Sequence, residues 1–282
     1  MRYVVLGGRG MLGHDLARAL EGRDVVALGR DQGDLTHPAA LRAAVDGADV
    51  IINAAAYTRV DDAETDEAAA TAINGTGAGD AARAAAEVGA RFVQISTDYV
   101  FDGSATAPYS EDTPLAPVSA YGRSKAEGER LVAQAHPAPH IVRTAWLYGE
   151  QGPNFPRTML TLAAGRDTVD VVTDQIGQPT WTRDLASGIV ELLDAEAPAG
   201  IYHVTNSGQA SKFELARAAF ELAGLDPDRV HPTDSASFVS PAPRPAYSVL
   251  GHDAWLAAGL SELRPWREAL AEAVAEGAVS PR

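Results

Sequence analysis

The chain has 282 residues, a net charge of −15, 46% hydrophobic and 22% charged residues, and no cysteine. These values are typical of a globular protein with a large core, and so acidic a surface repels nucleic acids and anionic membranes. No apolar run approaches the roughly 20 residues that span a bilayer, and the first residues lack a secretory signal. We therefore expect a cytoplasmic protein with no nucleic-acid or membrane partner. The lack of cysteine excludes disulfides, thiolate metal sites and cysteine nucleophiles.

The first half of the chain alternates strand-like apolar runs with helical segments. "RYVVLG" is followed by "MLGHDLARALE", and the alternation continues through "DVVALG", "LRAAVDG", "ADVIINAAA", "GAGDAARAAAEVG" and "RFVQIS". Strands that alternate with helices predict a parallel sheet covered on both faces. In the first helix Leu12, Leu16 and Leu20 recur at every fourth position, which predicts a stripe that faces the core. The predicted fold class is α/β, with a doubly wound parallel (Rossmann) sheet.

The alternation becomes looser after about residue 150. Helices are expected at about 183–195, 211–224 and 264–276, between short strand-like segments and the Pro-rich "VSPAPRPAYSVLG". We expect residues 1–150 to form a dinucleotide-binding domain, and residues 151–282 to form mainly a smaller α/β substrate-binding lobe with segments that return to the main domain. Such a lobe would close over the carboxyl edge of the sheet, where ligands bind in open α/β folds.

A glycine-rich turn joins the first predicted strand to the first helix. Gly7, Gly10 and Gly13 follow one another at intervals of three in "VVLGGRGMLG". Glycine allows a tight turn and a close approach of the backbone to a pyrophosphate, and a helix N-terminus offers N–H donors and partial positive charge. A purely structural turn is the alternative. The position between strand and helix favours dinucleotide binding.

The end of the second predicted strand, "ALGRD", bears on the choice of cofactor. An arginine at this point accommodates the 2′-phosphate of NADP, whereas an acidic residue bonds the 2′-hydroxyl of NAD. Arg30, with help from Arg9, favours NADPH, and the adjacent Asp31 keeps NADH open. Asp34 is expected near the adenosine, with a turn or cap role as its alternative.

Three further residues form a candidate catalytic set. Thr97 ends a predicted strand, and 24 residues later Tyr121 and Lys125 lie four positions apart on one face of a helix. Together they predict a phenol that donates a proton to a substrate oxygen while a reduced nicotinamide gives a hydride to the attached carbon. We expect the nearby ammonium to lower the phenol pKa from its usual value of about 10. Taken singly, Thr97 is equally typical of a strand cap and Lys125 of a solvated side chain.

Several segments together resemble a known family. "GGRGMLG", "NAAAYTRVDDAE", "STDYVFDG", "YGRSK", "RTAWLYG", "DQIGQPT" and "RPAYSVL" occur in the order found in extended short-chain dehydrogenases/reductases. More narrowly, and nearly end to end, the chain resembles dTDP-4-dehydrorhamnose reductases. The resemblance implies NADPH-dependent reduction of the C4 ketone of dTDP-4-dehydro-L-rhamnose to dTDP-L-rhamnose. Tyr121 would be the proton donor, with Lys125 and Thr97 in support.

The resemblance also implies which residues contact the ligands. Trp146 would pack its indole on the deoxysugar, with a core aromatic as the alternative, and we expect Arg244 in the Pro-rich loop to bind the diphosphate, with an exposed loop arginine as the alternative. The expected cofactor contacts are Gly7, Gly10, Met11, Leu12, Gly13, Arg30, Asp34, Leu35, Ala54, Ala55, Ala56, Tyr57, Thr58, Tyr121 and Lys125. The expected substrate contacts are Thr58, Val60, Thr97, Asp98, Tyr99, Trp146 and Arg244.

The sequence matches the family less closely at the positions linked to metal binding and dimer formation. Some members dimerise through a magnesium ion held by glutamates, and Asp15 and Asp184 match two of those positions, while the third, a C-terminal glutamate, has no firm match. Aspartate reaches less far than glutamate, and acidic residues in so acidic a chain are usually solvated. We therefore assign no metal ligands, leave Mg²⁺ open without expecting it, and expect a monomer or a homodimer.

Other functions share these motifs. One alternative is a 4-ketoreductase for another nucleotide deoxysugar, of the antibiotic-sugar or dihydrostreptose type. A second is a non-catalytic NADP-binding regulatory subunit, against which the intact Thr97, Tyr121 and Lys125 argue. A dehydratase is disfavoured because Tyr99 stands where its glutamate would be needed, and an epimerase because Arg30 argues against retained NAD.

Overall fold

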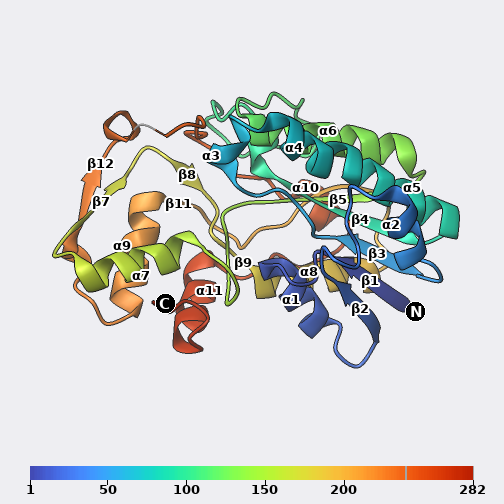
Figure 1. Ribbon diagram of the computed structural model, residues 1–282. Helices are drawn as coiled ribbons and strands as arrows, with labels where there is room; N and C mark the ends of the chain where they lie inside the picture. Colours follow the sequence, from blue (N-terminus) through green and yellow to red (C-terminus); the bar gives the residue numbers. More distant parts are fainter. Residues whose placement is uncertain (239, 282) are drawn as a thin grey trace.

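A six-stranded, wholly parallel sheet forms the centre of the molecule, in the order β10-β5-β4-β3-β1-β2 (Figure 1). This is a computed structural model, and it describes residues 1–238 and 240–281. The predicted α/β class with a wound parallel sheet is confirmed. The strands of the sheet are β1 (Arg2–Leu6), β2 (Asp24–Leu28), β3 (Val50–Asn53), β4 (Arg91–Thr97), β5 (His140–Thr144) and β10 (Gly200–His203).

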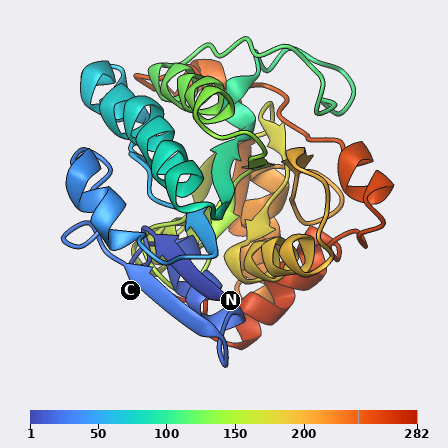
Figure 2. The same cartoon turned by 90° about the vertical axis from the view of Figure 1, so that its right-hand side faces the viewer.

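Both faces of the sheet are buried, each under its own layer of helices. Successive side chains of a strand point to opposite faces, so Tyr3 and Val5 join one apolar cluster while Val4 and Leu6 join the other. Figure 2 shows helices α5 and α6 on one side of the strands and α8 on the other. One layer consists of α1 (Met11–Ala19) and α8 (Thr182–Asp194), and the other of α2 (Pro38–Ala44), α5 (Ala78–Val88) and α6 (Ala120–Ala135).

The predicted leucine stripe of the first helix is confirmed. Leu12, Leu16 and Leu20 are buried in the cluster that includes α8. The four-residue spacing places them on one side of α1, where they pack against Leu185 and Ile189 of the second helix in this layer. The stripe therefore serves packing.

The wound sheet extends beyond residue 150. The sequence "GIYHVTN" contributes β10, which pairs in parallel with β5 at the edge of the sheet, and α8 packs against α1. Tyr202 and Val204 are buried in the same cluster as Leu185, so burial of apolar side chains holds this returning segment on the sheet.

The remaining C-terminal segments form a smaller α/β unit with its own apolar cluster. It lies at the left of Figure 1, beyond the carboxyl ends of the sheet strands. Its strands pair two by two, β7 with β12, β6 with β9 and β8 with β11. They are β6 (Leu147–Tyr148), β7 (Val169–Val172), β8 (Ile176–Gly177), β9 (Thr180–Trp181), β11 (Ala210–Ser211) and β12 (Val230–Thr233). Its helices are α7 (Phe155–Gly165), α9 (Lys212–Leu222) and α11 (Trp266–Ala275).

The three helices expected after residue 150 begin and end within two residues of the predicted positions. Among the described residues, no helix is both long and apolar enough to cross a membrane. Several short elements complete the chain. These elements are α3 (Val60–Ala63), α4 (Glu67–Thr71), the π-helical segment Ala72–Gly77, α10 (Asp253–Ala257) and the 3₁₀ turns Asp98–Val100, Pro227–Arg229 and Ser235–Ser237.

The strand order fixes where a ligand can enter. From β1 the chain crosses to β2 on one side, and it then returns to β3 on the other side of β1. Where neighbouring crossovers diverge in this way, the carboxyl ends of the strands leave a crevice in which ligands of open α/β sheets bind. The glycine turn follows β1 and Thr97 ends β4, so both border this edge.

Candidate active site

The glycine turn has the geometry that its spacing predicts. Gly7 has a φ of +78°, and a Cβ added there would lie 2.6 Å from the main-chain nitrogen of Ala55. A Cβ on Gly13 would lie 2.1 Å from the oxygen of Gly7, so α1 approaches the turn too closely for any other residue. Gly10 caps α1, and no side chain among the described residues occupies that cap. The first N–H groups of α1, from Met11 onward, are thus the donors that a pyrophosphate would use.

The two arginines expected near a 2′-phosphate lie at the end of β2, but each has an acidic partner. Arg9 pairs with Asp31 at 2.9 Å, and Arg30 contacts Asp34 at 3.3 Å. Both guanidinium groups are largely exposed, with 69% and 79% of the side chain accessible. Exposed pairs of this kind contribute only about 0–1 kcal/mol, so a phosphate can compete for either arginine.

The two residues expected near the adenosine behave differently. Asp34 accepts hydrogen bonds from the main-chain nitrogen and hydroxyl of Thr36 at 2.9 and 2.7 Å, and these bonds lower the pKa of its carboxyl to about 2. This is the turn role weighed as its alternative. The Leu35 side chain is buried in the core. A cofactor would therefore reach Leu35 through its backbone.

The loop after β3 is anchored by a residue that the sequence did not single out. Asn74, in the π-helical segment, accepts a hydrogen bond from the Tyr57 nitrogen at 2.8 Å and donates one to the Tyr57 oxygen at 3.0 Å. It also donates to the Ser124 hydroxyl on α6 at 3.0 Å. Asn74 therefore ties the loop 54–58, which holds five predicted cofactor contacts, to the helix of Tyr121.

The structure brings the three predicted catalytic residues to one place. Thr97 is the last residue of β4, and Tyr121 and Lys125 lie in the first turns of α6. Ser119 fixes where α6 begins, because its hydroxyl accepts a hydrogen bond from the Gly122 nitrogen at 3.1 Å. The buried Lys125 ammonium donates to the main-chain oxygen of Ile95, at 2.7 Å.

The pKa of the Tyr121 phenol differs from the expected value. We expected Lys125 to lower the pKa of the Tyr121 phenol, but burial and the neighbouring Asp98 raise it, and a hydrogen bond with Thr97 only partly opposes this. That part of the prediction is wrong for the protein without its cofactor, because the free energy of removing a phenolate from water exceeds the stabilisation that the surrounding groups provide. Burial also lowers the pKa of Lys125 to about 8, opposed by Glu129. Tyr121 is therefore held as a protonated phenol.

A cavity of about 520 Å³ lies where the smaller unit faces the end of β4. Three predicted substrate contacts line it, namely Tyr99, Trp146 and Arg244, whereas Thr58, Val60, Thr97 and Asp98 are outside its lining. The sequence did not single out Lys212 or Ser248 for this site. Among the described residues, the lining is Tyr99, Trp146, Phe155, Met159, Leu162, Arg166, Val169, Asp170, Val171, Val172, Gln175, Lys212, Phe238, Arg244, Pro245 and Ser248.

Trp146 occupies a special backbone position at this cavity. Its φ of +46° lies in the left-handed region, which non-glycine residues seldom adopt. A Cβ on Gly177 would lie 2.5 Å from the indole, so only glycine leaves room for the ring there. Strain of this kind persists where the surroundings enforce it, often at ligand sites.

Asp98 and Arg244 are two further charged groups at the cavity. Asp98 is buried, which raises the pKa of its carboxyl to about 6 even though Ser248 and Thr97 hydrogen-bond to it. Arg244 donates to Asp61 of α3 at 2.8 Å, a bond that ties the Pro-rich loop to the sheet edge.

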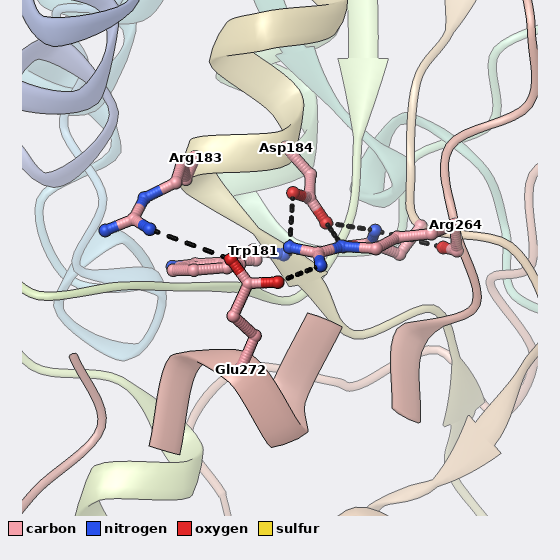
Figure 3. A network of polar contacts seen from close by, with 6 residues as sticks. Trp181, Arg183, Asp184, Arg264 and Glu272 are labelled. Carbon is pink, nitrogen blue, oxygen red and sulfur yellow. Dashed lines mark hydrogen bonds and ion pairs between the residues drawn. The ribbon is translucent and has the colours of Figure 1, made fainter. Parts of the chain in front are cut away.

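The two aspartates that match the family's magnesium ligands both have partners within the chain. Arg264 holds both Asp184 oxygens at 2.9 Å and also pairs with Glu272, as Figure 3 shows. Asp15 accepts a hydrogen bond from the Thr182 hydroxyl at 2.5 Å. Across the residues that the structure describes, no three His, Cys, Asp or Glu side chains are grouped to hold a metal. A guanidinium thus neutralises the carboxylate that a divalent cation would need.

The structure combines a wound parallel sheet, a glycine turn after β1 and a Tyr-x-x-x-Lys helix at the carboxyl edge of the sheet. Together these features define an NAD(P)H-dependent oxidoreductase. The chain matches the RmlD substrate binding domain family over residues 1–279. It belongs to the dTDP-4-dehydrorhamnose reductase family.

Individual relatives support this assignment. The chain is 51% identical to the probable dTDP-4,6-dihydroxy-2-methyloxan-3-one 4-ketoreductase of Streptomyces antibioticus, over 97% of this chain and 94% of the relative. It is 50% identical to the dTDP-4-dehydrorhamnose reductase of Streptomyces griseus, over 96% of this chain and 92% of the relative. The crystal structure of dTDP-4-dehydrorhamnose reductase from Bacillus anthracis in complex with NADP has a TM-score of 0.94 and 38% identity, and the match covers 98% of this chain and 99% of that one.

Proposed function

We propose that this protein reduces the C4 ketone of dTDP-4-dehydro-L-rhamnose with NADPH and forms dTDP-L-rhamnose. The observation that carries the proposal is the meeting of Thr97, Tyr121 and Lys125 at the carboxyl end of β4, with Tyr99 beside them in the cavity lining. Tyr99 packs edge-on against Tyr121, with ring centroids 5.6 Å apart. Tyr121 is thus one aromatic ring away from the lining of the cavity in which a sugar would lie.

Each residue has a distinct part in the reaction. Bound NADPH supplies the hydride that reduces C4. Tyr121 donates its phenolic proton to the ketone oxygen, which becomes the new hydroxyl, and the phenolate is then reprotonated from solvent. The raised pKa of Tyr121 keeps the donor protonated before the reaction. Thr97 hydrogen-bonds the ketone oxygen and orients it, and Lys125 holds the hydroxyls of the nicotinamide ribose.

Cofactor and substrate occupy different parts of the chain. Residues 1–150 hold NADPH, with the pyrophosphate at the N-terminus of α1 and the 2′-phosphate at Arg30 and Arg9. Residues 151–282 hold mainly the nucleotide sugar, with Arg244 at the diphosphate. Trp146, from the end of the first segment, packs against the deoxysugar ring. The B. anthracis complex with NADP supports this choice of cofactor.

A second candidate function is supported by the comparison with S. antibioticus. That 4-ketoreductase and the S. griseus dTDP-4-dehydrorhamnose reductase are 51% and 50% identical to this chain, so overall identity does not favour either sugar. The alternative is reduction of the C4 ketone of another dTDP-deoxysugar. Both reactions use the same proton donor and hydride.

Product analysis tests the proposal. The purified protein is incubated with NADPH and freshly generated dTDP-4-dehydro-L-rhamnose, and in parallel with the 2-deoxy ketosugar and with dTDP-4-keto-6-deoxy-D-glucose. NADPH oxidation with formation of dTDP-L-rhamnose, at the highest kcat/KM of the three, is the expected result. Faster turnover of another ketosugar would transfer the assignment to the second candidate, and inactivity with all three would refute both.

A further inference from the structure

Lysine is very rare in this chain. Of its 23 basic residues only Lys125 and Lys212 are lysines, and all others are arginines. Lys125 belongs to the candidate catalytic set, and Lys212 lines the cavity. An ammonium is a compact and strongly hydrated charge, harder to remove from water than a guanidinium. Lys212 is half-buried, so its ammonium is partly removed from water in a chain that uses arginine almost everywhere else.

Lys212 lies among aromatic rings. Its Nζ is 3.4 Å from the centroid of the Trp146 ring and 4.8 Å from that of Phe155. Within the described part of the chain, its ammonium has no hydrogen bond or ion pair. Cation–π contacts attract the ammonium but leave its hydrogen-bond donors unused. The ammonium thus retains its capacity to bind an anion.

The local electrostatics disfavour a cation at this position. Lys212 is the first residue of α9, whose N-terminus is closed by a capping box of Ser211 and Glu214 and carries partial positive charge. Burial lowers the pKa of Lys212 to about 7, opposed by Asp98 and aided by a smaller contribution from Arg244. A bound anion would stabilise the charged ammonium and so oppose the effects of burial and of Arg244.

The cavity is positively charged in an otherwise acidic protein. Among the described residues, its lining includes Arg166, Lys212 and Arg244 against Asp170, with Asp98 buried beside it, while the whole chain carries −15. Arg244 is already bonded to Asp61, whereas Lys212 has the Asp98 carboxyl nearby but no ion pair among the described residues. A doubly charged diphosphate matches such a pair.

We propose that Lys212 binds the diphosphate of the nucleotide sugar together with Arg244, and that its ammonium leaves the ring of Trp146 as it does so. The sugar can then pack on the indole that the ammonium covers in this structure. The nature of the ligand rests on the proposed function, whereas the diphosphate contact would be shared by any dTDP-sugar.

Binding of dTDP alone tests the first part, since this probe has the diphosphate but no hexose. Calorimetry compares the wild type with Lys212→Met, Lys212→Arg and the control Arg217→Met, which removes a cation from the same helix outside the cavity lining. We expect Lys212→Met to weaken dTDP binding tenfold or more, with thymidine and NADPH affinities unchanged. Lys212→Arg should retain most of the affinity and Arg217→Met all of it. Lys212 is half-buried and has no ion pair among the described residues, so Lys212→Met is expected to fold and loss of folding should not obscure the result.

NMR of lysine-labelled protein tests the second part. Two lysine side-chain signals are expected, and the one absent from Lys212→Met belongs to Lys212. Its Cε protons should be shifted upfield by the Trp146 ring, and adding dTDP should remove that shift.

Several outcomes would overturn the proposal. One is an unchanged dTDP affinity in Lys212→Met, and another is a Lys212 signal that keeps its upfield shift when dTDP is added. A third is a Lys212→Met variant that binds dTDP normally but binds the ketosugar substrate more weakly, which would assign Lys212 to a sugar hydroxyl. If the wild type binds dTDP through Lys212 yet does not reduce dTDP-4-dehydro-L-rhamnose, the proposed function fails and this inference stands.

Discussion

The ammonium of Lys125 donates a hydrogen bond of 2.7 Å to the main-chain oxygen of Ile95. This bond joins α6 to β4 two residues before Thr97, so the helix with the candidate proton donor and the strand with the candidate orienting hydroxyl are held together directly. A general acid must lie within hydrogen-bonding reach of the oxygen that it protonates, and this contact helps to fix that geometry.

The first prediction concerns the proton donor. Tyr121→Phe removes only the phenolic oxygen, and general acid catalysis is worth about 10²–10⁴-fold, so we expect kcat to fall by at least about a hundredfold. NADPH affinity should stay within about threefold, because the ring and the α6 backbone remain. Steady-state kinetics and NADPH fluorescence titration measure the two effects. Near-normal kcat in this variant would exclude Tyr121 as the donor.

The second prediction is a pH dependence of activity. Burial lowers the pKa of Lys125 to about 8, so the ammonium loses its charge as the pH rises through that value. Tyr121 stays protonated over the same range, because its pKa is raised. We expect kcat/KM to fall above pH 8, and Lys125→Arg to move this fall to higher pH. A profile that is flat to pH 10 would contradict a role for the Lys125 charge.

The same pKa shift predicts a change of stability with pH. The folded protein releases the Lys125 proton at about pH 8, whereas an unfolded lysine keeps it to about 10.5, so between these values the unfolded state binds more protons. This group should therefore raise the free energy of unfolding as the pH rises from 8 to 10.5. Comparing urea unfolding of wild type and Lys125→Met across that range isolates the contribution, which Lys125→Met should lack.

The fourth prediction concerns a buried ion pair below the site. Arg143 and Glu129 form two hydrogen bonds of 3.0 and 2.8 Å, and their side chains are only 2% and 4% exposed. Glu129→Gln leaves a buried guanidinium without its counter-charge, so we expect the free energy of unfolding to drop by about 3–5 kcal/mol. The double variant Glu129→Gln/Arg143→Met should lose less than the sum of the single losses. Additive losses in urea unfolding would mean that the two charges are not coupled.

The fifth prediction concerns cofactor choice. Because the Arg30 side chain is 79% exposed, Arg30→Ala should leave Tm unchanged. Loss of a charged contact to the 2′-phosphate should raise KM for NADPH about tenfold and leave KM for NADH unchanged. If both constants rise equally, Arg30 does not bind the phosphate.

Much of the first half of the chain could be interpreted from the sequence because its signals are local. A strand, a glycine turn and a helix adjoin in the chain, so Gly7, Gly13 and the leucine stripe could be interpreted from spacing alone. The Tyr-x-x-x-Lys spacing likewise places both side chains on one helix face. The roles of these residues toward ligands stay predictions.

The tertiary structure decided what depends on residues distant in the chain. Asn74 reaches both Tyr57 and Ser124, and Arg264 reaches Asp184, across separations that no local pattern encodes. The raised pKa of Tyr121 and the position of Lys212 over Trp146 also appear only after folding, because desolvation depends on every segment packed around a group. Spacing along the chain determines which side chains share a face, and packing determines what those side chains meet.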